Sequence, residues 1–215
     1  MSQSFLRTLV SLSFAALLLM CMGVEATAQG QQVNGTWTWA HSPGTGHKDG
    51  LGFSGEVVVR PKKELAVVGR AGMEWTAKGY LGNGNAKRAD LNLRYIPKPS
   101  SVFKPFGQVG IAVVNNTTSD YSKTARFITA GGGVDYNILV IAEWRHFFRE
   151  NQTLNRGSSD KFNLGVYIPF ERNSRWLAVV NVFVQRTKFT QPNGPDAGVH
   201  RAWSTGVGFG VGYKF

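Results

Sequence analysis

The sequence is poor in cysteine and in long hydrophobic runs. Its single cysteine, Cys21, lies within the first 28 residues, so residues 29–215 cannot form a disulfide among themselves. Beyond Met22, no apolar stretch approaches the roughly 20 residues that a membrane-spanning helix requires. Disulfide cross-links and spanning helices are therefore both excluded as the organising principle of residues 29–215.

Acidic residues are also scarce. Thirteen aspartates and glutamates face 24 lysines and arginines, which gives a formal net charge of +11. In a soluble protein such an excess would suggest a nucleic-acid partner. The basic residues here are spread over expected loops and one face of expected strands instead of forming a single stripe. We therefore expect no nucleic-acid partner.

The N-terminus has the pattern of a secretory signal peptide. Arg7 precedes the apolar run Leu9–Met22, and the small residues Ala26 and Ala28 flank Thr27. That run is too short to span a membrane as a helix, and the small-residue triplet is typical of a cleavage site. We expect cleavage after Ala28, export from the cytoplasm, and one mature domain over residues 29–215.

The last strand-like segment alternates strictly between large apolar and small or polar residues. Phe209, Val211, Tyr213 and Phe215 alternate with residues 208, 210, 212 and 214, which are three glycines and a lysine. A period of two places the large residues on one face of a strand. In a closed transmembrane barrel that face meets lipid, and closure removes the exposed strand edge. The terminal aromatic also resembles the signature by which bacterial outer-membrane barrels are recognised for insertion.

Ten segments show strand character, with connections that alternate between short and long. The predicted strands are Val33–His41, Leu51–Arg60, Leu65–Thr76, Lys87–Ile96, Phe103–Val114, Ala125–Asn137, Ile138–Phe148, Lys161–Phe170, Arg175–Thr187 and Arg201–Phe215. Short turns belong to the periplasmic end of an outer-membrane barrel and long loops to its exterior. The sequence thus predicts an all-β fold, a closed antiparallel transmembrane β-barrel of ten strands with both termini in the periplasm. Eight strands is the alternative, and ten requires Gly35–Trp39 to pair with the final strand.

Aromatic residues at one parity of these strands fall at two heights. The group near the short turns is Tyr95, Phe103, Tyr136, Phe170, Trp176, Tyr213 and Phe215; the group near the long loops is Trp39, Trp75, Phe148, Phe162 and Trp203. Two such girdles mark the interfaces of a membrane. Aliphatic residues, among them Leu91 and Val182, occupy the same parity between them and predict the lipid-facing surface.

The opposite parity is rich in charge and glycine. We expect a salt-bridge network inside the barrel, made by Glu56, Arg70, Glu74, Arg88, Asp90, Arg94, Glu143 and Arg145. Charges away from bulk water must be paired, because isolation costs several kcal/mol for each. Two interpretations remain open: a polar core that plugs a small barrel, or a gate along a narrow ion path.

Three stretches in the middle of the chain resemble a known family. They are Phe106–Gly110, Ala130–Tyr136 and Ala142–Phe147, which look like the middle strands of small outer-membrane barrels of the outer-membrane protein A and opacity-porin type. The resemblance implies the architecture and no particular activity. That family's membrane domain usually has eight strands, so a count of ten would be a departure.

The sequence contains no complete catalytic or metal-binding motif of the kinds known in small outer-membrane barrels. A lipid A deacylase would show a His-x-Ser-Asn arrangement, but His146 is followed two residues later by Phe148 instead of a serine. The rim residues His41, His47, His200, Ser42 and Ser204 match no palmitoyltransferase motif, and the pairs His47 with Asp49 and Asp196 with His200 are weak candidates for an omptin-type protease. We expect no enzyme, no cofactor and no metal site.

The basic residues near the long loops suggest an anionic partner at the membrane surface. They include Lys48, Lys78, Lys87, Lys123, Arg126, Arg149, Arg156, Lys161, Arg186, Lys188 and Arg201. Lysine and arginine bind phosphates well, and lipopolysaccharide presents phosphates in the outer leaflet. We expect contacts with outer-membrane lipids, lipopolysaccharide and the barrel assembly machinery; the sequence gives no indication of oligomeric state. The expected function is a structural or surface-interaction barrel, with a narrow porin-like channel and a lipid A-modifying enzyme as alternatives.

Overall fold

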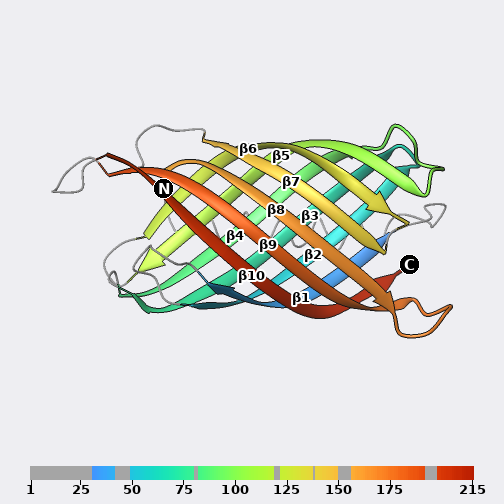
Figure 1. The fold of residues 1–215 in the computed structure, drawn as a ribbon, viewed down its shortest axis with the longest axis horizontal. Helices are drawn as coiled ribbons and strands as arrows, with labels where there is room; N and C mark the ends of the chain where they lie inside the picture. The colour runs from blue at the N-terminus through green and yellow to red at the C-terminus, as the bar shows by residue number, and fades with distance from the viewer. Residues whose placement is uncertain are drawn as a thin grey trace.

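The computed structural model describes residues 31–41, 49–79, 82–118, 122–137, 139–149, 156–191 and 198–215. These residues form one closed barrel of ten strands (Figure 1). The strands are β1 (Gln32–His41), β2 (Gly50–Lys62), β3 (Leu65–Gly79), β4 (Gly82–Tyr95), β5 (Phe103–Thr118), β6 (Ser122–Tyr136), β7 (Val140–Arg149), β8 (Arg156–Pro169), β9 (Trp176–Gln191) and β10 (Gly198–Lys214). The expected signal peptide and its cleavage residues Ala26 and Ala28 lie outside the described residues.

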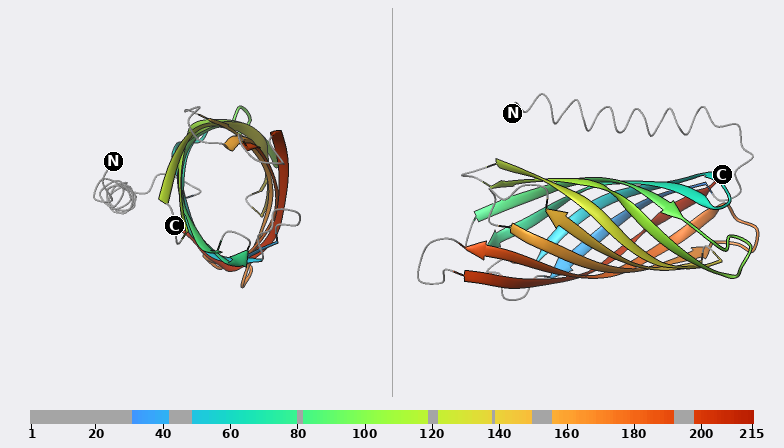
Figure 2. Two further views of the ribbon diagram at one scale, coloured as in Figure 1. Left: turned by 90° about the vertical axis from the view of Figure 1, so that its left-hand side faces the viewer. Right: turned by 90° about the horizontal axis from the view of Figure 1, so that it is seen from above.

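The barrel closes where β1 meets β10. Every strand pairs antiparallel with its neighbours along the chain, and β1 pairs with both β2 and β10. Gly35 lies opposite Val211 and Trp39 opposite Val207, as the ten-strand prediction requires. Seen along its axis, the sheet forms an unbroken ring (Figure 2). Ten strands are therefore confirmed, and the eight-strand alternative is wrong.

The strands extend further toward the long-loop end than the sequence predicts. Residues 77–86 were expected to be loop, yet β3 and β4 continue until Gly79 pairs with Gly82. Likewise, β5 and β6 pair as far as Thr117 and Ser122. The reason is that ladder hydrogen bonds use the backbone, so they persist where side chains become polar and alternation ends. The prediction mistook the loss of lipid-facing character for the end of the strand.

Tight turns join the strands at the other end of the barrel. Asn137 follows β6 with a φ of 50°, a left-handed conformation that asparagine adopts more readily than most residues. Its backbone N–H donates to the Val102 carbonyl (3.1 Å), which ties the turn to the start of β5. Between β8 and β9, the Ser174 hydroxyl accepts a hydrogen bond from the Trp176 N–H (3.0 Å). These turns keep that end of the barrel compact.

The exterior carries the apolar residues that a soluble protein would bury. Leu91 is 47% exposed while the next residue, Asn92, is 1% exposed, so the strand parity is the one predicted. Val182 is exposed to the same extent as Leu91, at mid-strand on β9. An apolar band around a closed ladder is the arrangement of a barrel surrounded by lipid. Within the described ranges, no helix is long and apolar enough to cross a membrane.

The interior is less polar than the sequence analysis predicts. Near the short-turn end, inward side chains form a buried apolar cluster, hereafter the apolar layer: Ile96, Phe106, Ile141, Tyr167, Leu177 and Val179. Val58, Ala66 and Val68 form a second, smaller group on β2 and β3. On β9 the face opposite the lipid was expected to be polar, but Leu177, Val179 and Phe183 lie on it. The barrel thus has apolar residues on both faces at this end.

Candidate functional site

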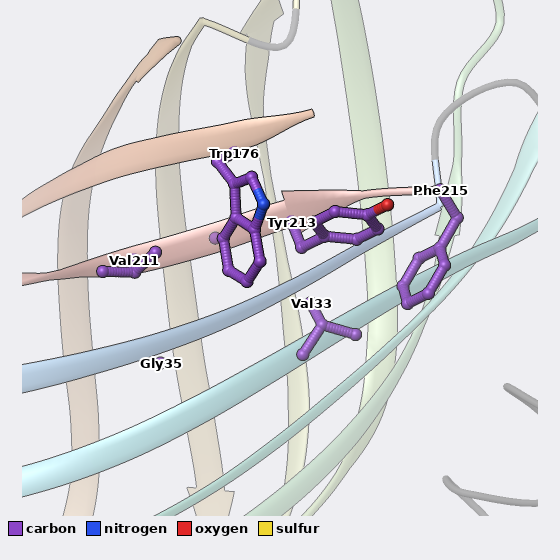
Figure 3. A pocket seen from close by; sticks show the side chains of 7 residues that line it. Val33, Gly35, Trp176, Val211, Tyr213 and Phe215 are labelled. Atoms are coloured by element: carbon purple, nitrogen blue, oxygen red, sulfur yellow. The ribbon is translucent and has the colours of Figure 1, made fainter. Parts of the chain in front are cut away.

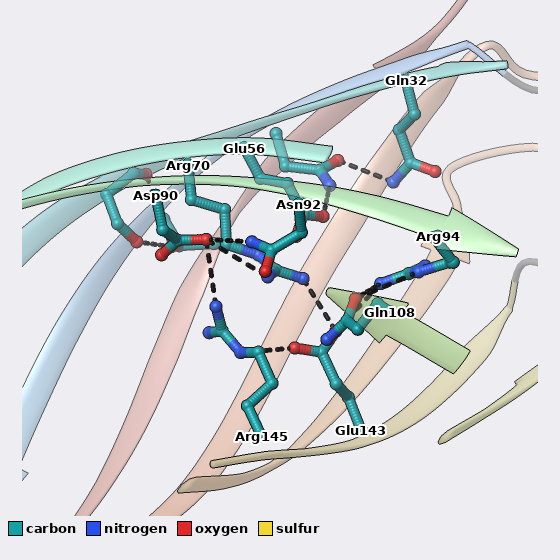
Figure 4. A network of polar contacts seen from close by, with 12 residues as sticks. Gln32, Glu56, Arg70, Asp90, Asn92, Arg94, Gln108, Glu143 and Arg145 are labelled. Carbon is teal, nitrogen blue, oxygen red and sulfur yellow. Dashed lines mark hydrogen bonds and ion pairs between the residues drawn. The ribbon is translucent and has the colours of Figure 1, made fainter. Parts of the chain in front are cut away.

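Charged side chains from opposite walls meet in the middle of the lumen (Figure 4). Arg70 projects inward from β3, and its Nε lies 2.5 Å from Glu56 Oε2 on the neighbouring strand. Its Nη2 lies 2.8 Å from Glu143 Oε2 on β7. Because β3 and β7 are four strands apart around the ring, the second contact crosses the lumen.

Glu143 is the acceptor on which three arginines converge. Besides Arg70, Arg94 Nη2 lies 2.9 Å from Glu143 Oε2, and Arg145 Nε lies 2.6 Å from Glu143 Oε1. Glu143 is only 1% exposed. A carboxylate removed from water to this extent is tolerated only with charged partners, and three are present.

Asp90 forms the second acceptor of the network. It lies 3.0 Å from Arg145 Nη1 and 3.6 Å from Arg70 Nη1. Its Oδ1 also accepts a hydrogen bond from Asn92 Nδ2 (2.7 Å), and Asn92 Oδ1 in turn accepts one from the Thr129 hydroxyl (2.7 Å). The aspartate is therefore held by both charge and neutral donors.

The network is electrically balanced. Its three arginines (Arg70, Arg94, Arg145) face three carboxylates (Glu56, Asp90, Glu143). Each of these six residues was expected in the lumen network. A spacing of two or four residues within one strand predicts three pairs: Arg70 with Glu74, Arg88 with Asp90, and Glu143 with Arg145. Of these, only Glu143 with Arg145 lies within ion-pair distance in the described structure.

Two expected members lie apart from the network. Glu74 faces inward on β3 but forms no ion pair with any described residue; Arg70, its expected partner, binds other carboxylates. Arg88 lies over the Phe147 ring, 5.0 Å from its centroid, instead of pairing with Asp90. Spacing along one strand identifies residues on one face, but long side chains choose partners across the lumen, which spacing does not reveal.

The network rests directly on the apolar layer. The Arg94 guanidinium lies 3.9 Å from the centroid of the Phe106 ring, which belongs to that layer. Gly133 makes room for the ring: a Cβ there would collide with the Ala142 carbonyl oxygen and lie 2.8 Å from Phe106 Cζ. Charge and apolar packing thus form adjoining layers within one lumen.

A second inward ion pair escaped the sequence analysis. Arg60 Nη2 lies 2.9 Å from Asp135 Oδ2, joining β2 to β6 near the short turns. The apolar layer was also missed. Its signal is visible in the run Leu177–Val180, and that of the second group in Val57–Val59 and Leu65–Val68, because consecutive apolar residues place apolar groups on both faces of a strand. Alternation at the other positions of these strands predicts a polar inner face, which these runs interrupt.

The C-terminal residues expected to guide insertion lie on the outside of the closing seam. Phe209, Val211 and Phe215 are exposed to the exterior, and the Tyr213 ring packs edge-on against Trp176 with centroids 5.0 Å apart. Together with Val33, Gly35 and Gly212, the residues Trp176, Val211, Tyr213 and Phe215 line an apolar groove of about 410 Å³ (Figure 3). In a bilayer, hydrocarbon chains would occupy this shallow surface.

A polar pair interrupts the exterior near the long loops. His146 Nδ1 and Asp160 Oδ1 lie 2.7 Å apart on the outward faces of β7 and β8. Phe148 stands two residues beyond His146, where a His-x-Ser arrangement would need its hydroxyl. Ser159, beside Asp160 in sequence, faces inward and bonds to the Arg186 carbonyl (3.2 Å). The barrel wall therefore separates this serine from the histidine.

The other histidine candidates are only partly described. His41 Nδ1 lies 2.5 Å from Asp49 Oδ1 at the exposed end of β1. His47 and the side chain of His200 fall outside what the structure describes. Among the described residues there is no group of three or more His, Cys, Asp and Glu that could hold a metal ion.

A closed ring of ten strands, an apolar exterior with aromatic ends and a charged interior define the class: this is a transmembrane β-barrel.

No family model matches the sequence, and no curated protein matches it either. Structural similarity is found to bacterial outer-membrane barrels at low sequence identity. The translocator domain of the autotransporter NalP from Neisseria meningitidis aligns with a TM-score of 0.44 and 13% identity, over 99% of this chain and 98% of that one.

Two further solved structures illustrate the range of similar barrels. The outer membrane protein OprG from Pseudomonas aeruginosa aligns with a TM-score of 0.39 and 13% identity, covering 86% of this chain and 95% of that one. Outer membrane phospholipase A from Escherichia coli gives a TM-score of 0.40 and 10% identity, covering 85% and 92% respectively.

Proposed function

We propose that this protein is an integral outer-membrane barrel of structural or surface-interaction type, whose lumen is closed by the charged network and the apolar layer. The contact between Arg70 and Glu143, which crosses the lumen at 2.8 Å, carries the proposal. A conducting pore would need that crossing to be open, whereas here the charges of Arg70 and Glu143 neutralise each other and Glu143 is buried. The apolar layer beneath adds a second barrier that is unfavourable to ions.

Conductance of the refolded barrel in a planar bilayer tests this proposal. The wild-type protein should give no discrete steps. Replacing Phe106 and Leu177 of the apolar layer together by alanine should raise the frequency of openings, and Phe103→Ala on the exterior serves as the matched control. Regular unitary steps from the wild-type barrel would favour the narrow channel instead.

We further propose that the short-turn end, with both termini, faces the periplasm and that the long-loop end meets lipopolysaccharide. Outward-facing cations support this at the latter end: Lys87, Arg126, Arg186, Lys188 and Arg201. The Arg186 guanidinium also lies 5.7 Å from the Trp203 ring centroid, at the height of an aromatic girdle. Phosphates of the outer leaflet would lie within reach of these groups.

Stability in vesicles with and without lipopolysaccharide tests the lipid contact. Lipopolysaccharide should raise the urea midpoint of the wild-type barrel, and the double variant Arg186→Gln, Arg201→Gln should lose most of that rise. Lys62→Gln, Lys63→Gln at the opposite end is the control. Equal stabilisation of both double variants would contradict a specific phosphate contact.

A catalytic role is the less favoured proposal. The His146–Asp160 pair has no hydroxyl or thiol nucleophile within hydrogen-bond distance among the described side chains, so nucleophilic catalysis lacks its attacking group. Mass spectrometry of lipid A from cells with and without the protein should show identical species. Loss or gain of an acyl chain would establish an enzyme.

A further inference from the structure

Three cations gather inside the barrel on the long-loop side of the charged network. Arg145 on β7 and Lys161 on β8 are direct cross-strand partners, and both face inward. Arg88 approaches from β4: its guanidinium and that of Arg145 lie 5.0 Å and 5.3 Å from the centroid of the same Phe147 ring. Like charges placed directly opposite on paired strands destabilise a sheet.

Among the described residues, Arg145 is the only one of these three cations that forms an ion pair. Arg145 is bound by Asp90 and Glu143. Arg88 and Lys161 form no ion pair with any residue that the structure describes. Lys161 Nζ instead lies 4.3 Å from the Phe183 ring centroid. Glu74, another inward carboxylate, lies beside Gly50 on β2 and forms an ion pair with neither cation.

The two cations also remain accessible. Arg88 and Lys161 are half-buried, unlike Arg94 and Arg145 deeper in the lumen. The network and the apolar layer lie on one side of them, and the long-loop end lies on the other. A small solute entering from the long-loop end would reach Arg88 and Lys161 before it reached the network and the apolar layer.

We propose that Arg88 and Lys161, with Arg145 beside them, form a binding site for a small oxyanion of the phosphate type. The arginine fork matches an oxyanion in geometry and the lysine adds a mobile point charge. A bound dianion would neutralise both unpaired cations and remove the repulsion between Lys161 and Arg145. The inference stands independently of whether the barrel conducts, since it requires only access from one end.

Calorimetric titration of the refolded barrel with inorganic phosphate, against chloride at equal ionic strength, tests the site. The wild-type protein should bind one phosphate, and Arg88→Gln or Lys161→Gln should weaken the affinity at least tenfold. Lys161→Arg should retain binding, and Lys98→Gln, in the turn after β4, should leave it unchanged. Equal affinity in all variants, or no phosphate binding by the wild type, would overturn the proposal.

Urea unfolding gives a second readout that does not depend on comparing affinities. Phosphate should raise the wild-type midpoint above that in chloride, and this rise should vanish in Lys161→Gln. In chloride alone, Lys161→Gln should unfold at the wild-type midpoint or above, because an unpaired cation has been removed. A lower midpoint would show that the Phe183 ring already satisfies Lys161, and would likewise overturn the site.

Discussion

Single side chains in this barrel differ sharply according to which face of the strand they occupy. Leu91 and Asn92 are neighbours in sequence, but one contacts the surroundings and the other is bonded to Asp90 and Thr129. Replacing Asn92 by a larger residue would therefore break both hydrogen bonds in a space with no room for the added atoms. Tolerance at an inward position therefore depends on whether its side chain is already bonded and buried, as at Asn92, or partly exposed, as at Asn181.

The lipid face gives the first prediction at the scale of the residue. Val182→Arg should lower the free energy of unfolding in vesicles by about 2–4 kcal/mol, because a charge at mid-membrane is exposed to hydrocarbon. Asn181→Arg, whose side chain faces the lumen, should cost less. Urea titration in phospholipid vesicles measures both, and the reverse order would show that the barrel's faces are exchanged.

The second prediction at this scale concerns Glu143 in the lumen network. Glu143→Ala leaves the charges of three arginines short of their shared acceptor and should cost about 3–5 kcal/mol, the range for breaking a buried ion pair. Glu74→Ala, which removes an inward carboxylate that forms no ion pair with a described residue, should cost less than about 1 kcal/mol. Similar urea midpoints for the two variants would argue against a central role for Glu143.

At the closing seam, the last strand, β10, packs closely against β1. β10 connects β9 to β1, and Gly210 on it faces Thr36 with the backbones in close approach. A Cβ at Gly210 would collide with the Gly35 carbonyl oxygen, whereas nothing lies within 4 Å of a Cβ at Gly107 on β5. Position 210 at the seam requires glycine because a Cβ has no space there, whereas position 107 has space for a larger residue.

A prediction for this element follows. Gly210→Ala should destabilise the barrel by about 1–3 kcal/mol through overpacking. Gly107→Ala should change stability by less than about 0.5 kcal/mol. Thermal or urea unfolding distinguishes them, and a neutral Gly210→Ala would mean that the seam can separate without loss.

The C-terminal aromatic belongs to the same element. The Phe215 N–H donates to the Gln31 carbonyl (3.1 Å), and its ring lies 5.1 Å from that of Tyr213. Deleting Phe215 should reduce the amount of protein recovered in the outer membrane, if the terminal residues act in insertion. Fractionation and immunoblotting measure this, with Phe209→Leu as a control that keeps the apolar stripe. Wild-type levels of the truncated protein would contradict the idea.

For the molecule as a whole, the prediction concerns which end of the barrel faces the outside of the cell. Removal of residues 1–28 leaves no native cysteine, so introduced thiols can be labelled selectively. Asp49→Cys, at the long-loop end, should react with a membrane-impermeant maleimide on intact cells, while Asn173→Cys, in a short turn, should react only after lysis. The opposite pattern would place the short turns outside.

The sequence by itself determined the class, the strand number and the two faces of most strands. Period-two alternation depends only on neighbouring residues along a strand, and so the lipid stripe of β10 and the inward position of Glu143 could be predicted. The order of strands followed because short connections allow only adjacent antiparallel pairing. The extent of the strands at the long-loop end did not follow, since backbone pairing there continues beneath polar side chains.

Only the tertiary structure decided which inward residues meet. Arg70 lies four positions from Glu74 in the chain, yet it binds Glu56 and Glu143, because closing the ring brings β3 and β7 to opposite walls of one narrow space. The same closure brings Leu177, Val179 and Phe106 into one apolar layer, and it leaves Arg88 and Lys161 without an ion pair to any described residue. Contacts across a lumen join residues far apart in sequence, and the alternation of residues along one strand does not predict the distance between them.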